Sequence, residues 1–375
     1  MGEIIPAPWG GYIVTSYALC DQVLRDKAWS VPDAGWRTSN STRWNSPASQ
    51  QMAASLPMLN PPQHTLERRS LGGLFPHNSL AALRPSVERA VDRLLTEFTD
   101  QLRLGPVNFH GVVSEELPVM AIGEWMAIPA SDYGLLRDLT HDQVFAQELF
   151  PTPSQLALSD SATMQLRLYF SELIRDRRKR PGSDPISRWL RTWDAQEPDR
   201  HRADRAVHDL ALFMILAALE TTSHVLSTAV RLLLQFPDHL EPLRHDPDLI
   251  PAAVDEVLRY DAPIHMISRI ASTDTQLGEF VVPAGEMVQL MVGAAHHDPD
   301  RYPEPHRFSL LRGGSHLAFG AGIHYCAGNA LARLEAVTLL TALLSLPMRL
   351  HLSGPPQWAP RVAFRRITSL PISLA

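Results

Sequence analysis

A cysteine set among glycines is the feature of this sequence that points most directly to chemistry. Cys326 follows His324 by two positions, and the flanking glycines are Gly320, Gly322 and Gly328. Glycine permits backbone conformations and close approaches that a β-carbon blocks. A flat macrocycle lying against the backbone requires that freedom, so the segment is a candidate for binding one.

The residues that follow Cys326 are typical of a helix, which places the cysteine at a helix N-terminus. Backbone N–H groups and the helix dipole at such an end favour a thiolate over a thiol. A thiolate ligand pushes electron density onto a haem iron and favours cleavage of the O–O bond of dioxygen. A lone cysteine is more commonly a small buried hydrophobe, and the surrounding residues are what favour the ligand interpretation.

The ten residues FGAGIHYCAG resemble the haem-binding loop of the cytochrome P450 family, FxxGx(H/R)xCxG. The defined positions of that pattern are occupied by Phe319, Gly322, His324, Cys326 and Gly328. The resemblance implies haem b (iron protoporphyrin IX) as cofactor, with Cys326 as the axial ligand of the iron. It also implies that His324 binds a haem propionate.

An acidic and a basic residue lie three positions apart on a predicted helix before this loop. Glu256 and Arg259 match the E-x-x-R motif of the family, and Arg307 matches the third member of its triad. The resemblance implies a structural role, in which the triad holds the helix to the loop beneath the haem. Without the resemblance, the pair would be interpreted as a surface ion pair of little energetic value.

Three further basic residues are candidates for binding the haem propionates. His64 and Arg68 lie four apart on one helical face, which suits charge-assisted bonds to a carboxylate. They match a propionate-binding motif of the bacterial branch of the family, and Arg269 matches another propionate-binding arginine. Burial of two carboxylates requires several such partners.

A carboxylate and a hydroxyl, Glu220 and Thr221, directly follow ten apolar residues in a long predicted helix. One interpretation is that Glu220 faces solvent and Thr221 bonds to the preceding helical turn. The resemblance implies instead that the pair delivers protons on the distal side of the haem, with Thr221 as hydrogen-bond donor and Glu220 as relay. Cleavage of the O–O bond requires two protons, which an apolar pocket does not supply.

Periodicity predicts a mainly α fold with a small β portion, in a single domain over residues 1–375. The long segment 30–62, rich in Ser, Asn, Trp and Pro, is expected to be a loop. The resemblance implies the cytochrome P450 fold, with the haem between the long central helix and the helix after the cysteine loop. Helices are predicted over about 64–74, 79–103, 110–126, 131–146, 161–179, 205–235 and 250–260, and β-richer segments near 10–15, 270–290 and 350–375.

Composition excludes several classes of protein. The net charge of -6 argues against a nucleic-acid-binding surface. Two cysteines, Cys20 and Cys326, cannot form a disulfide framework, which favours a reducing, cytoplasmic location. The longest apolar run has ten residues, too few to span a membrane, and the N-terminus lacks the features of a signal peptide. A monomer is expected.

The expected function is that of a bacterial monooxygenase of secondary metabolism, such as antibiotic biosynthesis. It would use O2 and two electrons to hydroxylate or epoxidise a small, largely apolar organic molecule. A ferredoxin and an NAD(P)H-dependent ferredoxin reductase would supply the electrons as separate proteins that dock on the cysteine side. Core packing explains the candidate substrate contacts equally well; by family position these are Phe213, Met214, Ala217, Ile264, Met266, Ile267 and Ile367.

Two alternatives remain open at this stage. The first is a cytochrome P450 that catalyses oxidative C–C or C–O coupling, or crosslinking, of a peptide or of a substrate bound to a carrier protein. The mass of the product separates it from hydroxylation, because coupling removes two hydrogens and adds no oxygen. The second is a non-catalytic haem-binding sensor, against which Glu220 and Thr221 argue because a sensor has no need of a proton relay.

Overall fold

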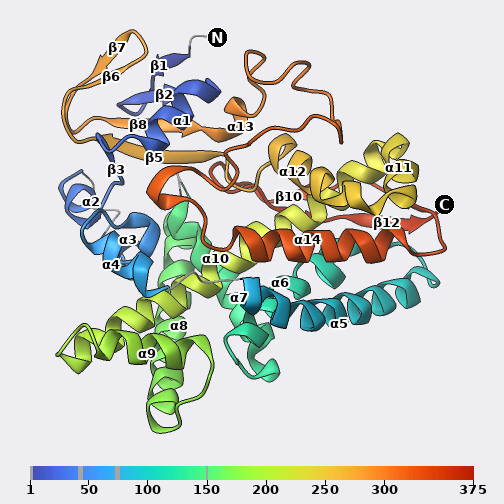
Figure 1. Cartoon of the computed structure of the whole chain (residues 1–375), viewed down its shortest axis with the longest axis horizontal. Helices are drawn as coiled ribbons and strands as arrows, with labels where there is room; N and C mark the ends of the chain where they lie inside the picture. The colour runs from blue at the N-terminus through green and yellow to red at the C-terminus, as the bar shows by residue number, and fades with distance from the viewer. Residues whose placement is uncertain (1–2, 41–44, 72–76, 149–150) are drawn as a thin grey trace. The chain divides into compact units, whose positions relative to one another are not determined.

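The computed structural model describes residues 3–40, 45–71, 77–148 and 151–375 (Figure 1). Most of these residues lie in helices and the strands are short, which confirms the predicted mainly α fold with a small β portion. The α-helices are α1 (Tyr17–Arg25), α2 (Ala34–Asn40), α3 (Pro47–Ala53), α4 (Gln63–Ser70), α5 (His77–Leu102), α6 (Glu116–Trp125), α7 (Tyr133–Gln143), α8 (Pro153–Lys179), α9 (Pro185–Asp194), α10 (Arg200–Gln235), α11 (Leu240–His245), α12 (Ile250–Tyr260), α13 (Val292–Ala295) and α14 (Asn329–Leu344).

Strands occur in the three segments predicted to be β-rich and in a few shorter stretches. They are β1 (Ile4–Pro6), β2 (Tyr12–Val14), β3 (Trp29–Ser30), β4 (Val107–Asn108), β5 (Met266–Ala271), β6 (Thr275–Leu277), β7 (Phe280–Val282), β8 (Met287–Met291), β9 (Leu350–Leu352), β10 (Gln357–Trp358), β11 (Ile367–Ser369) and β12 (Pro371–Leu374).

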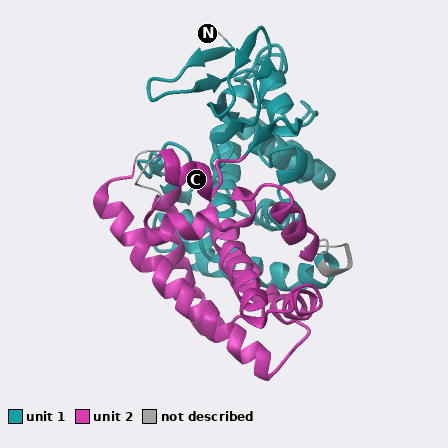
Figure 2. Cartoon of the chain, turned by 90° about the vertical axis from the view of Figure 1, so that its left-hand side faces the viewer, with its two compact units in different colours: residues 1–30, 77–118, 221–375 teal, residues 31–76, 119–220 magenta. Residues whose placement is uncertain are grey.

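The chain divides into two compact units, each assembled from segments that are separated in the sequence (Figure 2). The first unit comprises residues 1–30, 77–118 and 221–375, and it holds every strand found in the described residues. The second comprises residues 31–76 and 119–220 and is helical. Helices α6 and α10 each contribute to both units, because the division falls within each of these two helices.

A five-stranded sheet in the first unit positions one predicted site residue. Its strand order is β1-β2-β8-β5-β3, with β2 and β8 parallel and the other neighbours antiparallel. Val14, Val288 and Leu290 are fully buried and belong to one apolar cluster with Leu24 of α1. Arg269 of β5 lies opposite Val288 of β8, so the sheet holds its backbone in a defined register.

The prediction of a loop over residues 30–62 is wrong for most of the segment, because α2, α3 and the short 3-10 helix Leu56–Met58 form there. Ser46 caps α3 by accepting a hydrogen bond from the Ser49 backbone N–H, and Pro47 occupies the first helical position. Helices this short do not repeat an apolar pattern often enough to be recognised by periodicity. Residues 41–44 of the segment lie outside the described part.

Helix α10 is the only described helix long and apolar enough to cross a membrane. Its most apolar window is 78% buried within the protein, which is the environment of a core helix. Predicted from about residue 205, it begins at Arg200, and α8 likewise begins earlier than predicted. The reason at α8 is a capping box formed by Thr152 and Gln155 ahead of the apolar repeat.

Candidate active site

The backbone holds Cys326 where the sequence predicted it, just ahead of a helix. Its N–H donates a hydrogen bond of 2.9 Å to the carbonyl of Phe319, and the Asn329 side chain donates one of 2.8 Å to the Cys326 carbonyl. Asn329 is the first residue of α14. Cys20, in contrast, is fully buried, and burial raises the pKa of its thiol to about 12. Cys326 is therefore the cysteine suited to serve as a thiolate ligand.

Two glycines of the loop have conformations that other residues rarely adopt. Gly320 has φ +69° and Gly322 has φ +66°. A β-carbon on Gly322 would lie 2.2 Å from the carbonyl oxygen of Leu24, at the end of α1. Gly328 is different, since a β-carbon there would be 4.0 Å from the nearest atom, Sγ of Cys326. The shape of the loop thus depends on Gly320 and Gly322.

A buried ion pair connects α12 to the segment that leads into this loop. Arg259 Nε donates to Glu256 Oε2 at 2.7 Å and Arg259 Nη2 to Glu256 Oε1 at 2.9 Å. Arg259 Nη1 also donates to the carbonyl oxygens of His296 and Pro305, at 2.8 and 3.0 Å. Both members of the pair are at least 95% buried, so the predicted structural link exists.

The predicted third member of the triad, Arg307, is wrong. Its side chain is 69% exposed and, among the described residues, forms an ion pair with Glu304 alone. Arg312 lies 3.2 Å from Glu256, and 9% of its side chain is exposed. Arg307 contributes its backbone carbonyl, which accepts hydrogen bonds from Arg259 and Arg312. The two arginines lie five positions apart in a segment without regular structure, so periodicity does not decide which one points inward.

Arg269 provides the test of whether this fold suits an anionic cofactor. Its side chain is 6% exposed, and its hydrogen bond is donated to the neighbouring Ser268 carbonyl at 2.9 Å. Within the described ranges, no carboxylate lies within ion-pair distance of it, and burial lowers its pKa to about 10. Burial of a guanidinium without a counter-ion costs free energy unless a bound anion compensates its charge. A haem propionate is a carboxylate and can provide that negative charge.

The other predicted propionate ligands lie on short helical segments. His64 and Arg68 are one turn apart on α4, in the second unit, and His64 is 3% exposed. Burial, reinforced by the Arg68 charge, lowers the pKa of His64. His324 ends the 3-10 helix Gly322–His324, two residues before Cys326, and is partly buried. All three positions suit donors to a carboxylate.

The acid–alcohol pair of α10 has a partner that sequence reasoning missed. Glu220 is 4% exposed, so it does not face solvent, and its Oε1 lies 2.5 Å from Nδ1 of His141 on α7. Thr221 follows directly and is partly buried. No local signal marks His141, because it lies 79 residues from Glu220 in an ordinary amphipathic helix.

The candidate substrate contacts differ in exposure. Ile367 is fully buried at the start of β11, which makes it a core residue and not a lining residue. Met214 is also nearly fully buried. The remaining candidates retain accessible surface; they are Phe213, Ala217, Ile264, Met266 and Ile267.

A cysteine ahead of a helix, in a loop whose shape depends on glycine, and a buried arginine suited to an anion provide what a haem-thiolate protein requires. The family model "Cytochrome P450" matches residues 148–346. The chain is 32% identical to cytochrome P450 monooxygenase PikC of Streptomyces venezuelae, over 96% of this chain and 84% of that one. This chain belongs to the cytochrome P450 family.

Two further relatives extend the comparison. The chain is 31% identical to 6-deoxyerythronolide B hydroxylase of Saccharopolyspora erythraea, over 86% of this chain and 78% of that one. It superposes on the structure of P450BioI in complex with an acyl carrier protein ligated to hexadec-9Z-enoic acid, with a TM-score of 0.89 and 28% identity over 97% and 92% of the two chains. The protein is accordingly an oxidoreductase that uses O2 and paired electron donors, with haem b as its cofactor.

Proposed function

We propose that this cytochrome P450 is a monooxygenase that hydroxylates or epoxidises a small, largely apolar natural product. The observation that carries the proposal is the buried carboxylate of Glu220, hydrogen-bonded to His141 and adjacent to Thr221 in α10. Monooxygenation consumes two electrons and two protons, places one oxygen atom in the substrate and releases the other as water. A buried carboxylate next to a hydroxyl meets the need for protons within an apolar stretch of helix.

The residues of this chain have separate tasks in the proposed reaction. When bound, haem b supplies the iron centre at which dioxygen is reduced and its O–O bond is cleaved. Cys326 would hold the iron, while the propionates would be held by four basic residues, namely His64, Arg68, Arg269 and His324. Thr221 would be the hydrogen-bond donor on the distal side of the haem, where protons are delivered.

Glu220 would accept a proton and pass it to the Thr221 hydroxyl, which can both accept and donate. His141 is the positioning residue in this scheme. Its side chain is 18% exposed, so the imidazole connects the buried Glu220 carboxylate to a less buried part of the protein. A charge-assisted hydrogen bond of 2.5 Å also holds that carboxylate in one orientation.

An apolar substrate is supported by the character of the candidate contacts. These candidate residues carry no charge. A lining of apolar side chains binds apolar surface more favourably than it binds polar groups. The names of two relatives, a monooxygenase and a hydroxylase, support oxygen insertion. A secondary-metabolic role, a bacterial source and a cytoplasmic location form part of the proposal.

The electron donors would be a ferredoxin and its NAD(P)H-dependent reductase, docking on the cysteine side as separate proteins. The loop around Cys326 presents two exposed side chains there, Ile323 at 50% and Tyr325 at 39%. Neither residue occupies the position of the iron ligand, which the motif assigns to Cys326. The enzyme would act as a monomer, without nucleic acid or membrane.

A second candidate function is oxidative coupling or crosslinking of a substrate that is bound to a carrier protein. It is favoured by the similarity to P450BioI, whose structure contains a ligated acyl carrier protein. The third possibility, a haem-binding sensor, has no use for the buried Glu220–His141 pair. The three functions differ in their products: one added oxygen, two hydrogens lost, or no product.

The test is turnover of purified holoenzyme with a ferredoxin, a ferredoxin reductase and NADPH. Substrates found by a high-spin shift of the Soret band would be incubated under labelled dioxygen, and the products would be analysed by mass. One labelled oxygen atom per product molecule supports the proposal. Loss of two hydrogens without label supports coupling, and binding without turnover supports a sensor.

A further inference from the structure

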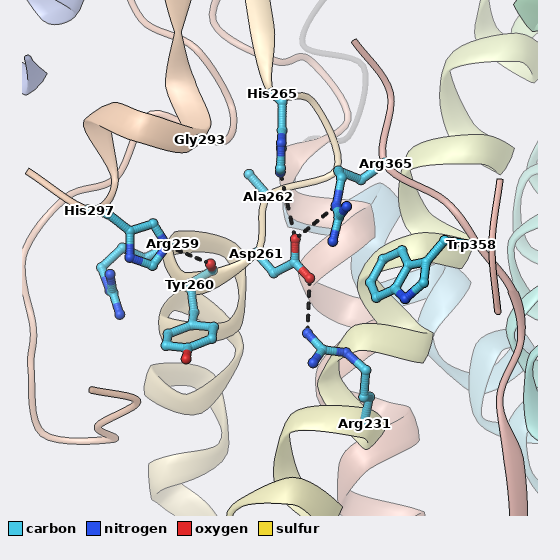
Figure 3. A pocket seen from close by; sticks show the side chains of 10 residues that line it. All are labelled: Arg231, Arg259, Tyr260, Asp261, Ala262, His265, Gly293, His297, Trp358 and Arg365. Atoms are coloured by element: carbon cyan, nitrogen blue, oxygen red, sulfur yellow. Dashed lines mark hydrogen bonds and ion pairs between the residues drawn. The ribbon is translucent and has the colours of Figure 1, made fainter. Parts of the chain in front are cut away.

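A cavity of about 290 Å³ in the first unit has no assigned role. It is lined by four segments: the C-terminal half of α10, the end of α12 with the residues that follow to 265, residues 293–297, and residues 358–365 (Figure 3). Of the residues that line it, Asp261 is the single carboxylate. Five of the others carry basic side chains, namely Arg231, Arg259, His265, His297 and Arg365.

Arg365 is held in place without using its hydrogen-bond donors. Its guanidinium carbon lies 4.0 Å from the centroid of the Trp358 ring, on which it stacks. Its Nε lies 3.5 Å from Asp261 Oδ1 and makes no hydrogen bond. Within the described residues no hydrogen bond is formed by the side chain, which is 35% exposed. An arginine stacked in this way presents its N–H edge to a ligand in the plane of the guanidinium.

Arg231 adds a second positive charge. Its Nη2 donates to Asp261 Oδ2 and its Nη1 to Gln235 Oε1, both at 2.9 Å. Its Nε is buried without a hydrogen-bond partner, and 12% of its side chain is exposed. Asp261 is thus shared by two arginines, and His265 Nε2 lies 3.6 Å from its Oδ1.

The charges around the cavity therefore do not cancel. Two arginines face one aspartate, which leaves at least one positive charge uncompensated. Arg259 does not change this balance, because its charge is directed at Glu256, which Arg312 also contacts. A partly enclosed surplus of positive charge with unused N–H donors attracts an anion of matching size.

We propose that this cavity is a binding site for a small oxyanion, a carboxylate or phosphate group, held by the N–H edge of Arg365 with His265 and the charge of Arg231. The guanidinium would donate two parallel hydrogen bonds to two oxygens of the anion. Trp358 would fix its plane. Asp261 keeps the arginines in place and limits the site to small ligands, because it repels an anion that goes deeper.

The position of the site gives it a route to the substrate region. The His265 N–H donates to the Ala363 carbonyl and the Arg365 N–H to the Pro263 carbonyl, both at 2.9 Å, so these two segments of the lining form one ladder. His265 points into the cavity (Figure 3). Alternation along an extended chain directs its neighbours Ile264 and Met266 to the other side. If the proposed function holds, an anion bound in the cavity lies on the opposite side of this segment from Ile264 and Met266, two candidate substrate contacts.

The experiment is calorimetric titration of the purified holoenzyme with inorganic phosphate and, in a separate series, with malonate, in a buffer free of both and of chloride. Wild-type protein should bind at least one of the two probes saturably with one site per chain. Phosphate alone would identify the ligand as a phosphate group, and malonate alone as a carboxylate. No saturable binding of either probe would overturn the proposal.

Variants assign the binding to the cavity. Arg365→Gln should weaken it about tenfold, the effect of losing a charge-assisted contact, and His265→Gln should weaken it less. Arg103→Gln is the matched control, because Arg103 directly follows α5, is 71% exposed, and its replacement should leave affinity unchanged. Equal affinity in wild type, Arg365→Gln and His265→Gln would place the anion elsewhere and contradict the proposal. The reduced carbon monoxide spectrum checks that each variant is folded, and if Arg365→Gln fails that check, His265→Gln decides.

Discussion

His141 Nδ1 and Glu220 Oε1 lie 2.5 Å apart, and this contact joins two helices of the second unit, α7 and α10. A buried carboxylate in contact with a less buried imidazole is the arrangement that a proton relay requires. The contact makes His141 the residue whose replacement best separates a relay from a purely structural hydrogen bond.

Replacement of His141 by Phe should lower the fraction of electrons that appear in product by about tenfold, because Glu220 loses a partner that orients it. The solvent deuterium isotope effect on product formation should rise as proton delivery becomes slower. His141→Gln retains a hydrogen-bond donor and should recover part of the fraction of electrons that appear in product. An unchanged isotope effect and an unchanged yield of product per electron in His141→Phe would show that His141 does not position Glu220 for proton transfer.

Thr221→Ala should consume NADPH with little product and with increased hydrogen peroxide, because the distal hydrogen-bond donor is lost. We expect product per NADPH to fall by about tenfold or more. Thr222→Ser is the control, since Thr222 is the adjacent threonine, is buried, and has no role in the scheme. If Thr221→Ala forms as much product per NADPH as the wild type, Thr221 is not the distal hydrogen-bond donor.

Arg312→Gln should destabilise the protein by about 3 kcal/mol or more, because a buried carboxylate loses one of its two cationic partners. Arg307→Gln should change stability by less than about 1 kcal/mol, because its ion pair with Glu304 is exposed. Thermal unfolding of the two holoenzymes measures the difference. The reverse order of stabilities would restore Arg307 as the third member of the triad.

Gly322→Ala should abolish stable haem binding, because the new β-carbon meets the Leu24 carbonyl at 2.2 Å and the residue has a positive φ. Gly328→Ala should be tolerated, because its φ is -88° and the closest atom is 4.0 Å away. The reduced carbon monoxide spectrum of each variant reports the thiolate-ligated haem. Equal spectra would mean that the loop adapts its path along α1.

Glu335 of α14 predicts a dependence of stability on pH. It is fully buried, its Oε2 has no partner in the described part, and burial raises the pKa to about 8 from an ordinary 4.5. The folded protein therefore holds this proton more tightly than the unfolded chain does. Stability falls as pH rises from about 4.5 to about 8 and levels off above that value.

Glu335→Gln retains the shape of the neutral acid and should remove this part of the pH dependence. The variant should exceed the wild type in stability at pH 9 by on the order of a few kcal/mol, with little difference at acidic pH. Denaturant unfolding of both proteins across that range measures the effect. Parallel stability curves would show that Glu335 is ionised in the folded protein.

The features that could be predicted from sequence are those whose residues are close together in the chain. The cysteine loop is one stretch, so its glycines and the following helix define its geometry locally. Glu256 and Arg259 lie three apart in one helix and meet because the helical repeat brings them together.

Contacts between distant segments were decided by packing alone. His141 reaches Glu220 because α7 packs within the second unit, and Arg312 replaces Arg307 because of the path of an irregular segment. The cavity at Asp261 collects side chains from four separate segments, and no spacing in the sequence relates them. Local geometry is set by residues that are neighbours in the chain. Contacts between distant segments depend instead on how all the helices and strands between them pack together.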